Sequence, residues 1–243
     1  MSFHGPFRQV PQFQHGPERA SARPPHTQHV DWHARYPNEV ILRGPSDRRA
    51  VALTFDDGPD NVWTPLILSV LAKYSVKATF TCVGQMVQGN PAILQQIFQA
   101  GHNIENHSWS HPDFTKVSAT EAKSQIERTN LLISQILHVK PRFFRPPYGA
   151  INDQVIAEVV SLGMKILYWD VDSLDWSGLT KEQVVANVLA HTEPGSIILM
   201  HSAGGRGGLA DTVQALPSII ETFRREGYLL TTLADLLREP AYQ

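Results

Sequence analysis

Two adjacent carboxylates, Asp56 and Asp57, are the first residues in this chain with a pattern that suggests chemistry. They precede Gly58-Pro59, and Asp-Gly-Pro is also common in ordinary turns. Neighbouring carboxylates repel each other, however, and burying them at a strand end requires a compensating cation. The pair therefore indicates either a bound metal ion or a nearby arginine.

A second pattern is the pair of histidines His107 and His111. A spacing of four places both imidazoles on one face of a helical turn, where they can bind one ion. The alternative is that they are two unrelated polar residues in a loop. A carboxylate elsewhere in the chain favours the metal site, because two histidines and one carboxylate form a hydrolytic zinc set with an open coordination position.

The segment Arg145-Pro146-Pro147-Tyr148 is a third candidate. Two consecutive prolines fix φ and hold the backbone that follows in a set direction. The segment is either a simple turn with a surface arginine or a device that holds Arg145 against a carboxylate. In the second case it also presents a backbone N–H to a developing oxyanion.

The elements that must position these residues follow from the apolar pattern. Short apolar runs predict strands over residues 51–55, 78–83, 165–169, 196–200 and 228–231. Amphipathic stretches predict helices over residues 65–74, 91–100, 120–138, 152–162, 180–191 and 209–226. Alternating strands and helices imply parallel strands with right-handed crossovers, in either a barrel or an open doubly wound sheet.

Helix boundaries are also predicted. Glycines that follow a helical stretch and precede an apolar run are expected to cap helices at their C-termini, at Gly101, Gly163 and Gly227. Asn90-Pro91 and Asn152 are expected to begin helices.

Polar residues gather directly after the apolar runs. They are Asp56-Asp57, Glu105-Asn106-His107, Arg145, the three aspartates Asp170, Asp172 and Asp175, and His201. In a parallel α/β fold all strand ends of one kind share a face, which is where such folds build their sites. We therefore expect these residues to converge on a single site.

Composition excludes several classes of protein. The chain has 243 residues, 42% of them hydrophobic and 18% charged, which is typical of a globular protein. A net charge of −2 argues against general nucleic-acid binding. The single cysteine, Cys82, excludes an intramolecular disulfide framework and a multi-cysteine metal site, so histidines and carboxylates must hold any metal.

Location is left open by the sequence. No apolar stretch is long enough to cross a membrane, and residues 1–23 lack the apolar core of a secretory signal. The sequence therefore fits either an intracellular protein or one whose export signal lies outside these residues.

A change in composition near residue 49 predicts two parts. Residues 1–49 hold seven of the 17 prolines and five of the 11 histidines, and we interpret them as a partly flexible leader. Residues 50–240 are predicted to be the catalytic domain.

In order along the chain, the motifs resemble those of the polysaccharide deacetylases, carbohydrate esterase family 4 with its NodB homology domain. They are Thr54-Phe55-Asp56-Asp57-Gly58-Pro59, His107-Ser108-Trp109-Ser110-His111, Arg145-Pro146-Pro147-Tyr148, Asp172-Ser173-Leu174-Asp175-Trp176 and Leu199-Met200-His201. The resemblance covers residues 50–237. The last motif often reads His-Asp in the family but is His201-Ser202 here.

The resemblance implies a distorted (β/α) barrel of about seven parallel strands. It implies Zn²⁺, or another divalent transition metal such as Co²⁺, held by Asp57, His107 and His111. It also implies hydrolysis of N-acetyl groups on N-acetylglucosamine units of peptidoglycan or chitin-like glycans, and such substrates suggest the cell envelope or the exterior.

Roles for the remaining motif residues follow from the same resemblance. Asp56 is expected to be the general base and His201 the general acid. Arg145 would orient the base, Asp175 would orient the acid, and the Tyr148 backbone N–H would bind the oxyanion. Substrate contacts are expected from Pro146, Trp176 and Leu199.

Other functions remain open. An O-acetyl esterase acting on acetylated xylan would have the same site, and a catalytically silent glycan-binding protein could keep part of it. The histidine-rich leader could store metal. The expected partner is a glycan polymer or oligosaccharide, with no nucleic acid and no membrane span, and a monomer is favoured.

Overall fold

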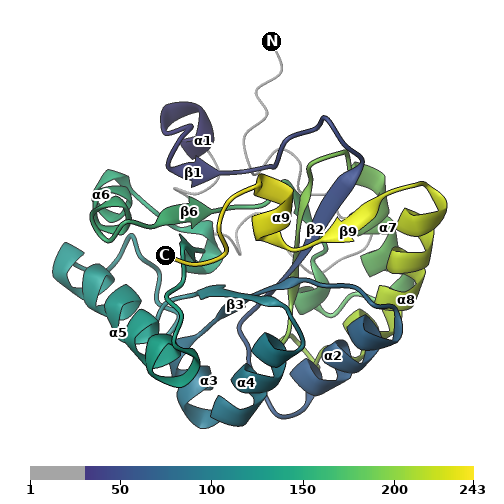
Figure 1. Ribbon diagram of the computed structural model, residues 1–243, viewed down its shortest axis with the longest axis horizontal. Coiled ribbons are helices and arrows are strands. Elements are labelled where there is room, and N and C mark those ends of the chain that lie inside the picture. Colours follow the sequence, from purple (N-terminus) through teal and green to yellow (C-terminus); the bar gives the residue numbers. More distant parts are fainter. Residues whose placement is uncertain (1–30) are drawn as a thin grey trace.

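A computed structural model of the protein describes residues 31–243. Its centre is a nine-stranded sheet with the order β1-β6-β5-β4-β3-β2-β8-β7, in which β9 also pairs with β2. All pairings are parallel, and the sheet curls into a half-barrel (Figure 1). The predicted distorted barrel is confirmed. The strands are β1 (Val40–Ile41), β2 (Ala50–Asp56), β3 (Thr79–Cys82), β4 (Asn103–Asn106), β5 (Phe143–Phe144), β6 (Lys165–Leu167), β7 (Val171–Asp172), β8 (Ile197–His201) and β9 (Leu229–Thr231).

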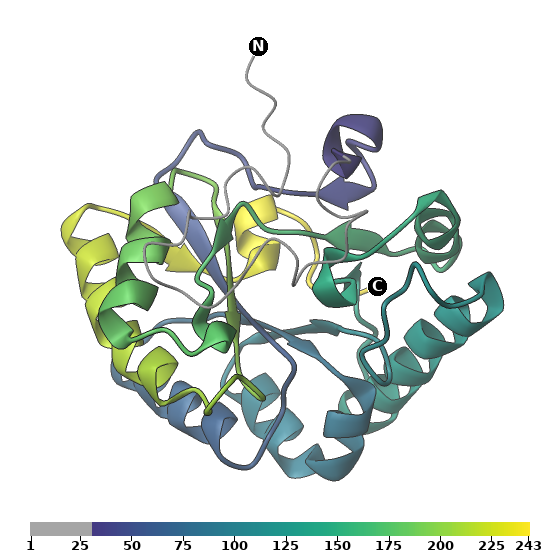
Figure 2. The same cartoon turned by 180° about the vertical axis from the view of Figure 1, so that it is seen from behind.

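The larger helices lie in an arc around the outside of the sheet, in both views of the molecule (Figures 1 and 2). They are α2 (Trp63–Lys73), α3 (Gly84–Gly89), α4 (Pro91–Gln99), α5 (Ala119–Leu137), α6 (Asp153–Ser161), α7 (Lys181–His191) and α8 (Ala210–Arg225). The shorter elements are α1 (Trp32–Arg35), α9 (Leu233–Leu237) and the 3₁₀ helices η3 (Pro147–Gly149) and η4 (Asp175–Ser177). No helix among residues 31–243 is long and apolar enough to cross a bilayer.

The predicted helix boundaries are confirmed. Gly101, Gly163 and Gly227 have φ values of 80°, 71° and 79°, a left-handed conformation that glycine adopts without steric cost. Asn152 accepts a hydrogen bond from the Val155 backbone N–H at the start of α6, and α4 begins at Pro91.

Strand β2 is buried along its whole length because both of its faces are covered. Val51, Leu53 and Phe55 pack into the apolar cluster that includes residues of α2, α7 and α8. Ala50 and Ala52 point the other way, into a second cluster that includes α9 residues. The two clusters together cover both faces of β2.

Helix α9 covers the end of the sheet where β3 and β4 begin. The Leu233 N–H donates to Thr79 Oγ1 (2.9 Å), and the Ala234 N–H donates to Asn103 Oδ1 (3.2 Å). Since this end of the strands is covered, the opposite end, where the strands finish, is the one available for a site.

Residues 31–49 pack against the domain. Val40 and Ile41 of β1 pair with β6, and the Arg43 guanidinium lies 3.0 Å from the Asp170 carboxylate and 2.9 Å from the Glu193 carboxylate. The predicted boundary at residue 49 stays a prediction. The proposed flexibility of residues 1–30 lies outside the described residues.

Candidate metal and active site

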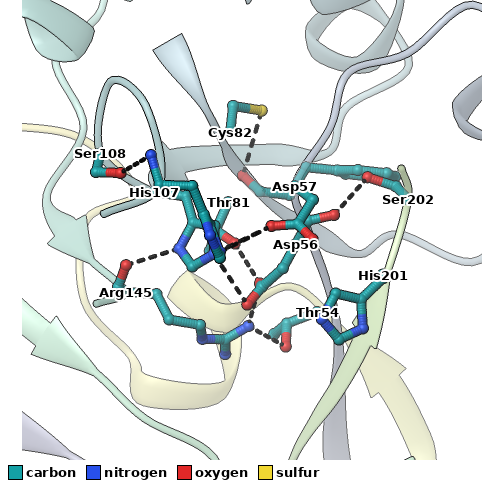
Figure 3. A network of polar contacts seen from close by, with 12 residues as sticks. Thr54, Asp56, Asp57, Thr81, Cys82, His107, Ser108, Arg145, His201 and Ser202 are labelled. Atoms are coloured by element: carbon teal, nitrogen blue, oxygen red, sulfur yellow. Dashed lines mark hydrogen bonds and ion pairs between the residues drawn. The ribbon is translucent and has the colours of Figure 1, made fainter. Parts of the chain in front are cut away.

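Asp57, His107 and His111 come together at the finishing end of the strands. Asp57 directly follows β2, and both histidines lie in the segment that follows β4. Asp57 Oδ1 is 3.4 Å from His107 Nε2 and 3.2 Å from His111 Nε2. Figure 3 shows Asp57 and the His107 imidazole pointing toward each other.

These three side chains fit a divalent metal ion such as zinc. Asp57 Oδ1 is buried without a hydrogen-bond partner, an arrangement that is costly unless a cation lies against it. Burial would raise the pKa of Asp57, but the neighbouring histidines, His107 first, outweigh burial and hold it well below its usual range. Burial and the nearby His107 lower the pKa of His111 to about 4, so its imidazole is neutral and has a lone pair to offer.

The orientation of the His107 ring is fixed by a backbone group. His107 Nδ1 lies 2.7 Å from the Arg145 carbonyl oxygen and donates its hydrogen there. Nε2, which faces the Asp57 carboxylate, is therefore left as the acceptor. Such an outer hydrogen bond selects the tautomer that a metal ligand requires.

Asp56 and Arg145 form a buried ion pair beside the metal residues. Arg145 Nη1 lies 2.6 Å from Asp56 Oδ1 and 2.8 Å from Thr54 Oγ1, and the Arg145 side chain is 0% exposed (Figure 3). The Thr81 hydroxyl donates a further hydrogen bond to Asp56 Oδ1. The other oxygen, Oδ2, is 3.6 Å from His107 Nε2 and so faces the metal side of the site. Asp56 is thus a buried carboxylate with one oxygen held by Arg145 and the other directed into the site, as a general base requires.

His201 lies at the end of β8, across the site from His107, and is held by Asp175. His201 Nδ1 donates to Asp175 Oδ1 (2.7 Å), and the His201 backbone N–H donates to Asp175 Oδ2 (2.9 Å). Thr212 Oγ1 donates to the same Oδ2 (3.1 Å). Burial alone would lower the pKa of His201, but the Asp175 carboxylate outweighs it and raises that pKa to about 10. His201 is therefore protonated near neutral pH, as a general acid requires.

Tyr148 lies in η3, in which Pro147 has no N–H and the Gly149 N–H donates to the Pro146 carbonyl (3.0 Å). Its φ of 59° is left-handed, and its ring contacts the His111 ring edge-on with 4.6 Å between centroids. Left-handed non-glycine residues also occur at Asp57, Ser108, His111 and Leu174. Such strain concentrates where the surrounding structure holds a functional geometry.

The structure corrects the expectation that all the polar residues at the strand ends converge on one site. Glu105 does not join it, because its carboxylate accepts hydrogen bonds from the Arg142 and Phe143 N–H groups where β5 begins. Asp170 does not join the site, because its carboxylate accepts hydrogen bonds from the Ser196 hydroxyl and the Ile197 N–H at the start of β8, the opposite end of the sheet. Asp172 accepts from the Leu174 N–H and shapes the loop before Asp175. Of the three aspartates after residue 169, Asp175 is the one bonded to His201.

The predicted substrate-contacting residues lie close to the catalytic groups in sequence. Pro146 follows Arg145, Trp176 follows Asp175, and Leu199 is in β8 two residues before His201. Their contacts with a sugar stay a prediction.

Two polar contacts of the site escaped the sequence analysis. Thr81 donates to Asp56 and Thr212 donates to Asp175, yet single threonines in a strand and a helix carry no signal of such contacts.

Comparisons with known proteins agree with this geometry. The family model described as polysaccharide deacetylase matches residues 43–167. A peptidoglycan-N-acetylglucosamine deacetylase of Bacillus cereus is 38% identical over 207 residues, which cover 85% of this chain and 74% of that protein. The deacetylase PgdA of Listeria monocytogenes is 36% identical over 191 residues, and the matched part is 79% of this chain but 39% of PgdA.

A solved structure gives the same result for the fold. The crystal structure of the Bc1960 peptidoglycan N-acetylglucosamine deacetylase superposes with a TM-score of 0.83 at 36% sequence identity, covering 87% of this chain and 98% of that one. Matching motifs, fold and identity over most of the chain lead to one conclusion: the chain belongs to the polysaccharide deacetylase family.

Proposed function

We propose that this protein hydrolyses the N-acetyl group of N-acetylglucosamine units in a glycan, releasing acetate and a free sugar amine. The observation that carries the proposal is a carboxylate held by an arginine on one side of the site and a protonated histidine on the other. On one side, Asp56 is held by Arg145 beside Asp57 and two histidines. On the other side, Asp175 keeps His201 protonated.

Amide hydrolysis needs an activated water, a polarised carbonyl and a protonated leaving group. When bound by Asp57, His107 and His111, a divalent metal such as zinc supplies Lewis acidity, which polarises a carbonyl and lowers the pKa of water. Asp56 accepts a proton from the attacking water through its oxygen facing the site. Arg145 fixes the direction of that carboxylate through a hydrogen bond of 2.6 Å from Nη1 to Oδ1.

The remaining steps use the other side of the site. The Tyr148 backbone N–H donates a hydrogen bond to the acetyl oxygen as it gains negative charge. His201 Nε2 then gives its proton to the amide nitrogen, the C–N bond breaks, and acetate leaves with the added hydroxyl. Asp175 holds the His201 ring by Nδ1, so Nε2 is the nitrogen directed to the substrate.

Peptidoglycan is the substrate class that we propose first, because two of the relatives are named as deacetylases of its N-acetylglucosamine residues. We propose the cell envelope as the location of the protein, because a substrate of this kind lies there. We propose zinc as the resident metal and a monomer as the working form.

The direct test is mass spectrometry of products after incubation of zinc-loaded protein with N-acetylglucosamine oligomers, peptidoglycan fragments and acetylated xylan. We expect each event on the first two to replace one acetyl group by hydrogen. Release of acetate from xylan alone would instead establish an O-acetyl esterase, and no release from any glycan would establish a silent binding protein.

The role of Asp56 is tested separately with Asp56→Asn. This variant keeps the size of the side chain but removes the base, so it should retain zinc and lose turnover by about 10²–10⁴-fold. Acetate release at the wild-type rate would refute the assignment.

A further inference from the structure

The segment from His107 to His111 carries two proposed metal ligands but is neither helix nor strand. Its backbone is nevertheless strained, since Ser108 and His111 have φ values of 69° and 58°. Left-handed conformations at non-glycine residues persist only when their surroundings enforce them. The partners of the backbone in this segment therefore decide where the His111 imidazole lies.

One atom of Gln125, in α5, is the hydrogen-bond partner of two backbone N–H groups in this segment. Its Oε1 accepts hydrogen bonds from the backbone N–H groups of Trp109 (2.9 Å) and Ser110 (2.8 Å). Its Nε2 donates to Ser110 Oγ (2.9 Å) and to Glu121 Oε1 (2.8 Å). The side-chain amide thus uses both acceptor positions and both hydrogens, so its orientation is fully determined.

The opposite side of the segment is bonded to α3. The Gly84 N–H donates to the Ser108 carbonyl and the Gln85 N–H donates to the Trp109 carbonyl, both at 2.9 Å. A side chain at Gly84 would collide with the Trp109 ring, at 2.4 Å from its Cε3. The segment is therefore held between two helices, with Gln125 as the anchor on the α5 side.

The Trp109 side chain adds to this anchoring. The Arg128 guanidinium of α5 lies 4.1 Å from the centre of its indole ring, within range of a cation–π contact. Arg128 is one helical turn after Gln125, so the same face of α5 holds both the backbone and the ring of residue 109.

We infer that Gln125 is a positioning residue for the proposed metal site: its side-chain amide holds residues 109 and 110 so that His111 meets His107 and Asp57. Gln125 does not reach the metal residues itself. It acts through the backbone, and its buried side chain (6% exposed) faces the segment rather than solvent. The inference rests on the proposed metal site.

The test compares zinc dissociation constants of purified, metal-free full-length variants, measured by competition with a chromogenic chelator. Gln125→Met has similar length but no acceptor, so the two backbone N–H groups lose their partner. We expect its zinc affinity to fall about 10–100-fold, the range for groups that support metal ligands. Gln135→Met, at an exposed position on the same helix, is the matched control and should bind zinc like wild type.

A charge-conserving double variant, Glu121→Gln with Gln125→Glu, separates positioning from packing. It keeps an acceptor for both N–H groups and a donor between positions 121 and 125, so zinc affinity should return to within about threefold of wild type. The thermal midpoint of each metal-free variant shows that it is folded. The double variant keeps the inference testable if Gln125→Met does not fold, because loss of zinc affinity in a folded double variant would overturn it.

The outcomes also separate this inference from the metal site itself. Wild-type protein that binds no zinc would overturn both. Wild type and Gln135→Met that bind zinc, with Gln125→Met binding equally well, would overturn the role of Gln125 alone.

Discussion

The site contains two aspartate–histidine groups built from the same residue types but in opposite charge states. Around Asp57, burial and a neighbouring imidazole keep His111 neutral, with a pKa of about 4. Around Asp175, the charge of the carboxylate and its hydrogen bond from Nδ1 keep His201 protonated, with a pKa of about 10. The difference lies in the partners of each imidazole.

This contrast supports the two roles proposed for these histidines. Imidazole must be neutral to bind a metal and protonated to act as an acid. His111 has another imidazole, that of His107, 4.9 Å away between ring centroids, whereas His201 donates to a carboxylate supported by Thr212. Substitutions on the two sides are therefore expected to have different effects on zinc content and on kcat.

The largest effect is expected for His111→Ala. Loss of a proposed ligand should remove zinc from the purified protein, measured by elemental analysis, and reduce deacetylation by more than the 10–100-fold typical of outer-shell changes. His191→Ala, an exposed histidine at the end of α7, is the control. Full zinc content in His111→Ala would contradict the ligand assignment.

On the other side, His201→Ala should leave zinc content unchanged while kcat falls about 10²–10⁴-fold, the usual contribution of a general acid. Acetate release and elemental analysis on the same sample check both parts. Loss of zinc from this variant would show that the two groups are not separate in function.

Asp175→Asn should have a smaller effect with a characteristic pH dependence. The carboxylate raises the pKa of His201, and without it that pKa falls. Activity that depends on protonated His201 is lost as pH rises through its pKa, so the basic limb of the kcat profile should move to lower pH. At pH 8 kcat should fall about 10-fold, and an unmoved basic limb would contradict the role.

The smallest effect is expected for Glu105→Gln, which tests how burial of a carboxyl group without an ion pair affects stability. Glu105 of β4 is buried, and burial raises its pKa well above the ordinary value, only partly offset by the N–H groups of Phe143 and Arg142. An acid with a raised pKa stabilises the fold at low pH, and that stability is lost as pH rises through the folded pKa. Glu105→Gln should therefore be more stable than wild type at pH 8 by about 1–3 kcal/mol.

Denaturant unfolding at pH 5 and pH 8 measures this effect. The advantage of Glu105→Gln should shrink at pH 5, because the raised pKa of Glu105 favours its protonated form as the pH falls. An equal difference at both pH values would mean that the charge of Glu105 is not responsible.

The sequence predicted the parts of this molecule that depend on local pattern. Strand ends carry Asp57, His107 and His201 to one face because parallel strands finish together, and that geometry needs no long-range information. The same reasoning gave the wrong position for Asp170. The chain between β6 and β7 runs back to the start of β8, a path that spacing alone does not reveal.

Gln125 shows a different limit. It lies on an amphipathic helix together with Gln135, and nothing in the sequence separates the two residues. Gln125 is buried against residues 109 and 110, whereas Gln135 is exposed. This difference depends on how α5 packs against the segment from His107 to His111. Roles that arise from contacts between a helix and a loop are set by tertiary packing.

Strands β1 and β7 lie at the two ends of the strand order of the half-barrel, and each has only two residues. An open sheet exposes backbone groups at its margins, which can recruit strands from other chains and lead to aggregation. Such short terminal strands offer too few unpaired groups to template another strand. By keeping these two margins this short, the described part of the fold leaves its sheet unclosed with little of the association hazard that usually accompanies open edges.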